Sequence, residues 1–207
     1  MHRLPLTAGL VGALALVAAP AFAQGMRSSM RSSRMAPHAA PAGTPSTIDF
    51  LRQAGASDKF EIEEGRAALK MARSKEVKDF ASRMIRDHTS SSAQLKAAAA
   101  RAHIAMPPAA LTAAQQRMLN MTQGMAKMGG FDADYVNDQV MAHQQALTLM
   151  SNYAAHGSSA ELRAAAAKIV PVVRSHLSMA QAMQRKMPKG HMGNMSKMAP
   201  KGAMRHK

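Results

Sequence analysis

The sequence of 207 residues contains no cysteine and no tryptophan, and only 3% of its residues are aromatic. Without cysteine, thiolate metal sites and thiol catalysis are excluded. The scarcity of aromatic residues and the abundance of alanine also disfavour β-sheets, which are enriched in aromatic and β-branched residues, whereas alanine is the strongest helix former. The composition therefore predicts an all-α protein.

Acidic residues are absent from both ends of the chain. The net charge is +15, but residues 47–183 hold 16 Lys and Arg against 12 Asp and Glu, which leaves only +4. Residues 24–46 carry three Arg, and residues 184–207 carry seven Lys and Arg. Neither tail has an aromatic residue that could stack on bases, so we expect no nucleic-acid partner. Anionic lipid or an acidic surface polymer is a better candidate, and solvated tails without a partner are the simpler explanation.

The first residues have the pattern of a secretory signal peptide. His2 and Arg3 precede an apolar run over residues 6–19, and residues 21–23 (Ala-Phe-Ala) form a small-x-small cleavage signature. The apolar run is too short to span a membrane. We therefore predict a signal peptide over residues 1–23 and a mature protein that is periplasmic or associated with the outer membrane.

Between the tails, apolar side chains recur with the helical period of 3.6 residues. We expect long helices over residues 47–72, 74–104, 131–156 and 159–185, and a short one over 112–127. Two short turns and one longer connection then predict an antiparallel four-helix bundle over residues 47–187. Gly55 and Gly65 in the first helix indicate a close helix–helix approach. The aperiodic segments 24–46 and 188–207 are predicted to be disordered.

Each long helix places one potential metal ligand on its buried stripe. These residues are Glu61, His88, His143 and His176. At a rise of about 1.5 Å per residue, counted from the turns, the members of each helix pair differ in depth by no more than about a turn and a half. Three imidazoles and one carboxylate at one level would suit a single zinc or copper ion.

Other polar residues lie near these candidates. Asp58 lies one turn from Glu61 and Gln139 one turn from His143, so both could support the ligands, as could Tyr135. The same groups could instead form a buried network of hydrogen bonds without a metal. A carboxylate-bridged di-iron centre needs Glu-x-x-His motifs, and the chain has none. We therefore expect no di-iron centre.

Methionine is abundant, with 20 residues. In the C-terminal tail, His191, Met192, Met195 and Met198 are candidate ligands for copper(I), because thioethers and imidazoles suit soft metals. The same methionines could scavenge oxidants without any metal. A further methionine stripe over residues 118–128 is more simply explained as flexible hydrophobic packing.

Several motifs occur in an order typical of one family. They are Glu61-Ile62-Glu63-Glu64-Gly65-Arg66, then VKDFASRMIRDH ending at His88, then Phe131-Asp132-Ala133-Asp134-Tyr135 with His143, and last Ile169-Val170-Pro171 with His176. Over residues 47–183 the chain resembles a secreted bacterial family known as domain of unknown function 4142, often labelled as outer membrane proteins and considered ferritin-like. The resemblance implies a ferritin-like bundle in the cell envelope, and it implies no known reaction.

These observations favour a periplasmic, non-enzymatic bundle that binds one metal ion in its core. The alternative is an envelope stress or structural protein with a hydrogen-bonded His/Glu core network. Its basic tails would then attach it to an anionic membrane surface. A metal-dependent oxidoreductase is a third interpretation, and it would need an open coordination position.

Overall fold

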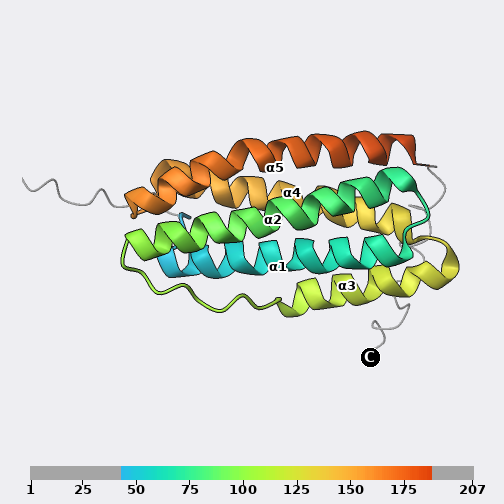
Figure 1. Ribbon diagram of the computed structural model, residues 1–207, viewed down its shortest axis with the longest axis horizontal. Helices are drawn as coiled ribbons and strands as arrows, with labels where there is room; N and C mark the ends of the chain where they lie inside the picture. Colours follow the sequence, from blue (N-terminus) through green and yellow to red (C-terminus); the bar gives the residue numbers. More distant parts are fainter. Residues whose placement is uncertain (1–42, 188–207) are drawn as a thin grey trace, which may run out of the picture. The chain divides into compact units, whose positions relative to one another are not determined.

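The computed structural model describes residues 43–187, where helices are joined by turns and by one longer connection over residues 102–112, with no strand in that range. The elements are α1 (Thr47–Met71), α2 (Lys75–Arg101), α3 (Ala113–Met125), the 3₁₀ helix η1 (Ala126–Met128), α4 (Phe131–His156) and α5 (Ala160–Lys186). The four long helices lie side by side, and α3 lies outside them against α1 and α4 (Figure 1). This all-α four-helix bundle, with a short extra helix between α2 and α4, is the predicted fold class. The predicted signal peptide, most of the N-terminal linker and the C-terminal tail lie outside the described residues.

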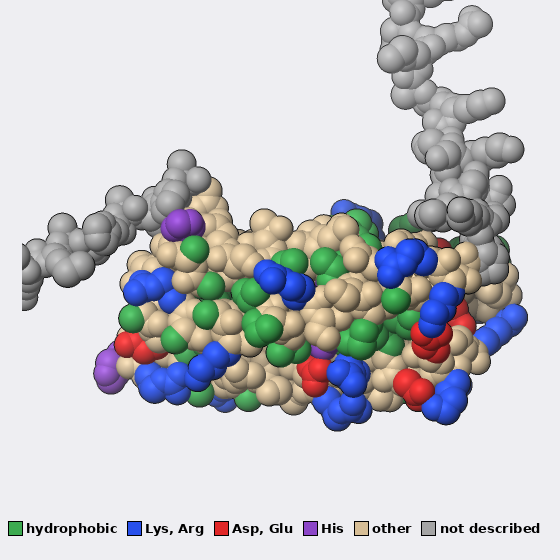
Figure 2. All heavy atoms as spheres, turned by 90° about the horizontal axis from the view of Figure 1, so that it is seen from above, with side chains coloured by type: hydrophobic (Ala, Val, Ile, Leu, Met, Phe, Trp, Pro, Cys, Tyr) green, Lys and Arg blue, Asp and Glu red, His purple; other side chains and the backbone are tan. Residues whose placement is uncertain are grey.

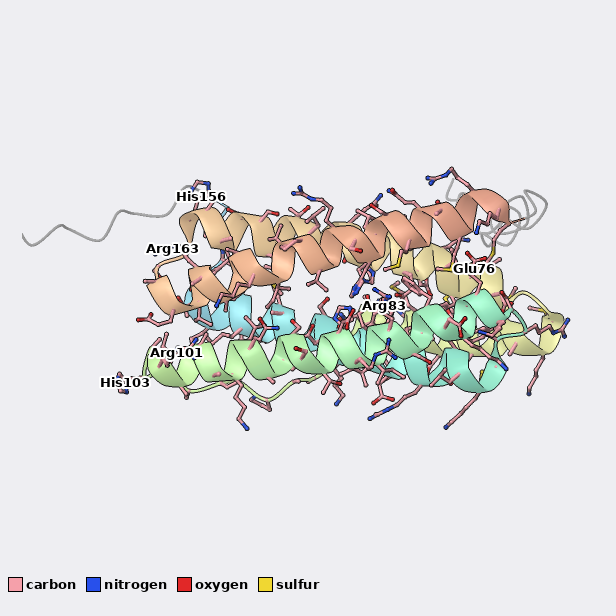
Figure 3. The ribbon with its side chains drawn as sticks, turned by 45° about the horizontal axis from the view of Figure 1, so that its top comes forward. Glu76, Arg83, Arg101, His103, His156 and Arg163 are labelled. Atoms are coloured by element: carbon pink, nitrogen blue, oxygen red, sulfur yellow. The ribbon has the colours of Figure 1, made fainter. Side chains whose placement is uncertain are left out.

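Neighbouring long helices run antiparallel. Phe50 at the start of α1 stacks on Tyr153 near the end of α4, with ring centroids 3.8 Å apart. Lys186 at the end of α5 forms an ion pair of 2.7 Å with Glu76 at the start of α2. Figure 3 shows Glu76 toward one end of the bundle and His156 at the other. Antiparallel packing of helices of similar length brings the middle of all four to one level.

Four of the five α-helices begin after a residue whose side chain caps the helix. The side chains of four residues accept a hydrogen bond from a backbone N–H three residues later: Ser46, Ser74, Thr112 and Ser159. Each such cap stabilises a helix by about 1 kcal/mol. The end of α2 differs from the prediction, because the helix stops at Arg101 and His103 adopts a left-handed φ of 55°.

The hydrophobic core consists of two clusters on either side of a polar layer. We name the clusters after one member each. The Phe50 cluster includes Phe50, Leu51, Leu95, Tyr153, Leu162 and Ile169. The Phe131 cluster includes Phe60, Val77, Met84, Phe131, Val136 and Met183. The polar layer comprises the buried residues Asp58, Glu61, Glu64, His88, Gln139, His143 and His176.

Gly65 permits a close approach of α1 to α2. A Cβ atom at this position would lie 2.9 Å from Cγ1 of Ile85 and 3.1 Å from the carbonyl oxygen of Ala81. Gly55 was expected to serve the same purpose, and this expectation is wrong. A Cβ atom there would meet only Ala109, at an ordinary contact distance of 3.6 Å. Of these two positions, packing therefore requires a glycine only at position 65.

The surface carries mixed side chains. On the face shown in Figure 2, Lys and Arg side chains are spread along the bundle, with hydrophobic side chains between them. This face shows no single basic patch of the kind that tracks a nucleic-acid backbone. Among residues 43–187, no helix has both the length and the hydrophobicity needed to cross a membrane.

Candidate metal centre

Three histidines from three helices meet in the polar layer. His88 comes from α2, His143 from α4 and His176 from α5, and none is more than 4% exposed. One nitrogen atom of each lies within 4.8 Å of those of the other two. Their ring centroids form a nearly equilateral triangle with sides of 5.3, 5.5 and 5.6 Å. We call these three residues the His triad.

Each imidazole of the triad donates one N–H to an oxygen atom. The three hydrogen bonds run from His88 Nδ1 to Asp58 (2.9 Å), from His143 Nδ1 to the backbone carbonyl of Gln139 (2.8 Å) and from His176 Nε2 to Asp87 (2.8 Å). Carbonyl and carboxylate oxygens can only accept, so these three nitrogens carry the protons. In a neutral ring, the other nitrogen then has a lone pair and no proton.

These lone pairs converge. Nε2 of His143 lies 3.3 Å from Nδ1 of His176, and Nε2 of His88 has no hydrogen-bond partner within the described residues. Two lone pairs at this distance repel each other unless a proton or a cation lies between them. Around a tetrahedral zinc with bonds of about 2.0–2.1 Å, ligand nitrogens are about 3.3–3.4 Å apart and imidazole centroids about 5.2 Å apart. The distance between His143 and His176 and the centroid distances of the triad match these values, and all three ligand nitrogens lie within 4.8 Å of one another.

The surroundings of the triad favour one positive charge. Burial lowers the pKa of His88, but the hydrogen bond to Asp58 and the charge of Glu61 outweigh burial, so the pKa is raised overall. Burial lowers the pKa of His143 to about 3 and that of His176 to about 4, and a positive charge on His88 acts in the same direction on both. Two rings therefore stay neutral, and a proton or a metal ion can supply the single charge.

Glu61 lies beside the triad rather than within it. Its Oε1 is 3.6 Å from Nδ1 of His143, the nitrogen that already donates to a carbonyl. Its Oε2 accepts a hydrogen bond of 2.6 Å from Nε2 of Gln139. Burial raises the pKa of Glu61, and the charge of His88 opposes that rise. No oxygen of Glu61 belongs to the converging group of ligand atoms, so its role as a fourth ligand stays a prediction.

The supporting residues differ in part from those predicted. Asp58 and Gln139 form hydrogen bonds inside the layer, and Ser92 donates to the second oxygen of Asp58 at 2.9 Å. The hydroxyl of Tyr135 is buried and has no hydrogen-bond partner within the described residues. Sequence reasoning missed Asp87, the acceptor for His176. The register of α2 against α5 is the signal that could have found it.

Asp87 links the triad to the surface. Its side chain is 34% exposed, whereas that of His176 is only 2% exposed. With five further residues it lines a groove of about 140 Å³ between α2 and α5: Ser90, Ser91, Gln94, Ile169 and Val172. Solvent in this groove therefore reaches a carboxylate that holds one of the three imidazoles.

The predictions for the methionine residues are confirmed only in part. Met118 packs against the Phe131 cluster, whereas Met121 and Met128 are 57% and 68% exposed. The stripe on α3 and η1 is thus part packing and part surface. The tail candidates His191, Met192, Met195 and Met198 lie outside the described residues, and their role stays a prediction.

An antiparallel four-helix bundle with polar side chains from facing helices in its middle is the architecture of ferritin-like proteins. Within this class, the chain belongs to the family described as "Domain of unknown function (DUF4142)", whose model matches residues 32–183. This is the family that the sequence motifs predicted.

Among solved structures, the chain is similar to the "Crystal structure of DUF305 fragment from Deinococcus radiodurans". The two share 13% identity with a TM-score of 0.58, over 70% of this chain and 98% of that one. At this identity the likeness shows the fold alone. No curated protein matches the chain.

Proposed function

We propose that this protein is a non-enzymatic metal-binding bundle of the cell envelope, and that the His triad binds one zinc or copper ion. The observation that carries the proposal is the convergence of three lone-pair nitrogens, on His88, His143 and His176. An ion at their centre would remove the repulsion between them. It would also give a partner to the buried Nε2 of His88, which otherwise costs about 1–3 kcal/mol.

The outer hydrogen bonds support a metal site in particular. Histidines that bind a metal typically donate their other N–H to a carboxylate or a backbone carbonyl, which fixes the ring and its tautomer. All three imidazoles of the triad do so, through Asp58, Asp87 and the carbonyl of Gln139. Imidazole ligands without thiolate suit zinc and copper(II). Glu61 is the nearest candidate for a fourth ligand.

The envelope part of the proposal rests on the signal-peptide pattern of residues 1–23. We expect the mature chain to begin at Gln24 and to fractionate with the periplasm or the outer membrane. N-terminal sequencing of the protein from fractionated cells measures both. An uncleaved chain in the cytoplasm would contradict this part of the proposal and leave the metal site untouched.

A metal titration tests the triad. The purified full chain is titrated with Zn²⁺ and with Cu²⁺, beside a His88→Ala/His143→Ala double variant whose helicity is checked by circular dichroism. The matched control is a His103→Ala/His156→Ala double variant, because both residues are exposed. We expect one ion per chain in the wild type and the control, and a loss of that ion in the triad variant.

Two results would overturn the core site: no stoichiometric ion in the wild type, or an ion that the triad variant retains. Removal of residues 188–207 serves as a further arm. If only this truncation abolishes binding, the metal function belongs to the tail.

A hydrogen-bonded core without a metal is the second candidate. The raised pKa of His88 favours it, because the hydrogen bond to Asp58 and the nearby negative charges together outweigh burial, and a proton can then supply the charge. The protein would then be an envelope structural or stress protein that its basic tails attach to anionic lipid. This candidate predicts no bound ion and a salt-sensitive binding to vesicles of anionic lipid that is lost without residues 188–207.

A further inference from the structure

A second group of buried polar atoms lies between α1 and α4, next to the His triad. Among residues 43–187, seven buried side-chain nitrogen or oxygen atoms have no hydrogen-bond partner, and five of them belong to this group. The five atoms are Oε1 of Glu61, both carboxyl oxygens of Glu64, Oη of Tyr135 and Oε1 of Gln139. Each of these four residues is at most 1% exposed.

The four side chains are neighbours. Glu61 and Glu64 are one turn apart on α1, and Tyr135 and Gln139 are one turn apart on α4. The hydrogen bond of 2.6 Å from Gln139 to Glu61 joins the two pairs. Burial is the largest cause of the raised pKa of Tyr135, and the charges of Glu61 and Glu64 raise this pKa further. The phenol therefore lies close to both carboxyl groups.

Of the four residues, Glu64 has the fewest interactions that could offset the cost of its burial. Burial, followed by the charges of Asp138 and Glu61, raises the pKa of Glu64 to about 9. No Lys or Arg contributes to this shift, and neither of its oxygens accepts a hydrogen bond within the described residues. Buried polar groups in proteins nearly always have a partner, since each one without costs about 1–3 kcal/mol. Five such atoms in one place indicate that a bound ion or buried water pairs with them.

The donor atoms define the class of that ligand. Carboxylate and amide carbonyl oxygens are the ligands of hard divalent cations, and the buried phenol can donate a hydrogen bond to them, whereas the imidazoles of the triad suit zinc and copper. We propose that Glu61, Glu64, Tyr135 and Gln139 form a second cation site, which takes a hard ion of the Mg²⁺ or Mn²⁺ class. This site shares Glu61 with the surroundings of the triad, whereas Glu64 belongs to this site alone. Buried water is the competing occupant of the same space.

Titration with Mn²⁺ tests the second site, because free Mn²⁺ has an electron paramagnetic resonance signal that is lost on binding. The full chain is compared with Glu64→Gln, which keeps the shape of a protonated Glu64. Glu63→Gln is the matched control, because it makes the same change at the neighbouring, surface-exposed residue, which pairs with Arg66. We expect one bound Mn²⁺ in the wild type and the control, and an affinity lower by at least about tenfold in Glu64→Gln.

A Zn²⁺ titration of the same variants separates this proposal from that for the triad. Glu64→Gln is expected to bind Zn²⁺ as the wild type does, so either site can fail without the other. Tyr135→Phe removes a single oxygen atom, and it serves if Glu64→Gln does not fold. The proposal is overturned if the wild type binds no Mn²⁺, as buried water would predict, or if both variants bind it as tightly as the wild type does.

Discussion

The two ends of the bundle bury apolar side chains, whereas its middle buries polar and ionisable ones. The Phe50 and Phe131 clusters are built from apolar residues, whose burial stabilises the fold by about 25 cal/mol per Å² of apolar surface. The polar layer between them holds three carboxyl groups and three imidazoles with little exposure to solvent. Burial of such groups costs free energy unless each has a partner.

All seven buried side-chain atoms of residues 43–187 that lack a hydrogen-bond partner belong to the layer or lie within about a turn of it. The two kinds of region therefore differ in what they contribute to stability. The apolar ends can account for the stability of the bundle, whereas the burial of polar groups without partners in the middle lowers that stability. A buried polar layer with atoms that lack partners is typical of a binding site without its ligand. The substitutions predicted below each change either an apolar end or the polar layer.

The largest effect is expected at an apolar end. Phe50 is fully buried and stacks on Tyr153, so Phe50→Ala should lower the free energy of unfolding by about 3–5 kcal/mol. Urea denaturation followed by circular dichroism measures this loss. Zn²⁺ affinity of the folded variant should stay at the wild-type level. A loss of less than about 1 kcal/mol in the free energy of unfolding would contradict a stabilising role of this end. A simultaneous loss of Zn²⁺ affinity would show that the apolar ends and the polar layer do not act independently.

In the middle, Glu64 should make the stability depend on pH. Its folded-state pKa of about 9 lies above the ordinary value of 4.5. Between these values the folded protein holds one more proton than the unfolded chain, so stability from this group is full below pH 4.5 and is lost as the pH rises toward 9. The expected slope is a loss of about 1.4 kcal/mol per pH unit.

Urea denaturation of chelator-treated protein at pH 5, 6, 7 and 8 measures that slope. Glu64→Gln should flatten it, whereas the surface variant Glu63→Gln should keep it. Equal slopes in the wild type and Glu64→Gln would show that Glu64 is not buried in its neutral form.

The contrast between ends and middle also explains how much the sequence could predict. The apolar ends follow from the 3.6-residue period, which is a property of each segment by itself, so the helices and their antiparallel order were predictable. The level of His88, His143 and His176 also follows from counting residues from the turns. Both inferences need only helix geometry and topology.

The partners inside the layer were harder to predict, because they depend on helix rotation and on side-chain rotamers. Asp87 precedes His88 directly, and it lies off the stripe toward α5, where it meets His176. Glu61 and His143 are at one depth, yet the carboxylate lies beside Nδ1 rather than among the lone pairs. Glu64 was not predicted to belong to the layer, and it is nevertheless fully buried.

A substitution of Asp87 should change metal binding in the polar layer with little effect on the stability of the fold. Asp87→Asn leaves an acceptor for the His176 N–H but removes the negative charge, so Zn²⁺ affinity should fall by about 10- to 100-fold. Because Asp87 is one-third exposed, the stability of the metal-free protein should hardly change. Asp79→Asn, on the exposed face of the same helix, is the control. An unchanged affinity in Asp87→Asn would remove Asp87 from the site.

The smallest effects concern two glycines of α1 that lie on either side of the layer. Gly55→Ala should raise the free energy of unfolding by about 0.5–1 kcal/mol, because alanine favours the helix and the new Cβ meets only an ordinary contact. Gly65→Ala has the same gain in helix propensity. However, its Cβ would collide with Ile85 and with the carbonyl of Ala81, and overpacking of this kind costs about 1–3 kcal/mol.

The two substitutions should therefore have opposite signs in urea denaturation, with a net loss of about 1 kcal/mol for Gly65→Ala. Because Gly65 follows Glu64 directly, a shift of α1 there would also move the oxygen group relative to the triad. Gly65→Ala should then weaken Mn²⁺ binding, while Gly55→Ala leaves it unchanged. If Gly65→Ala is instead as stabilising as Gly55→Ala, α1 and α2 are not held together closely beside the layer.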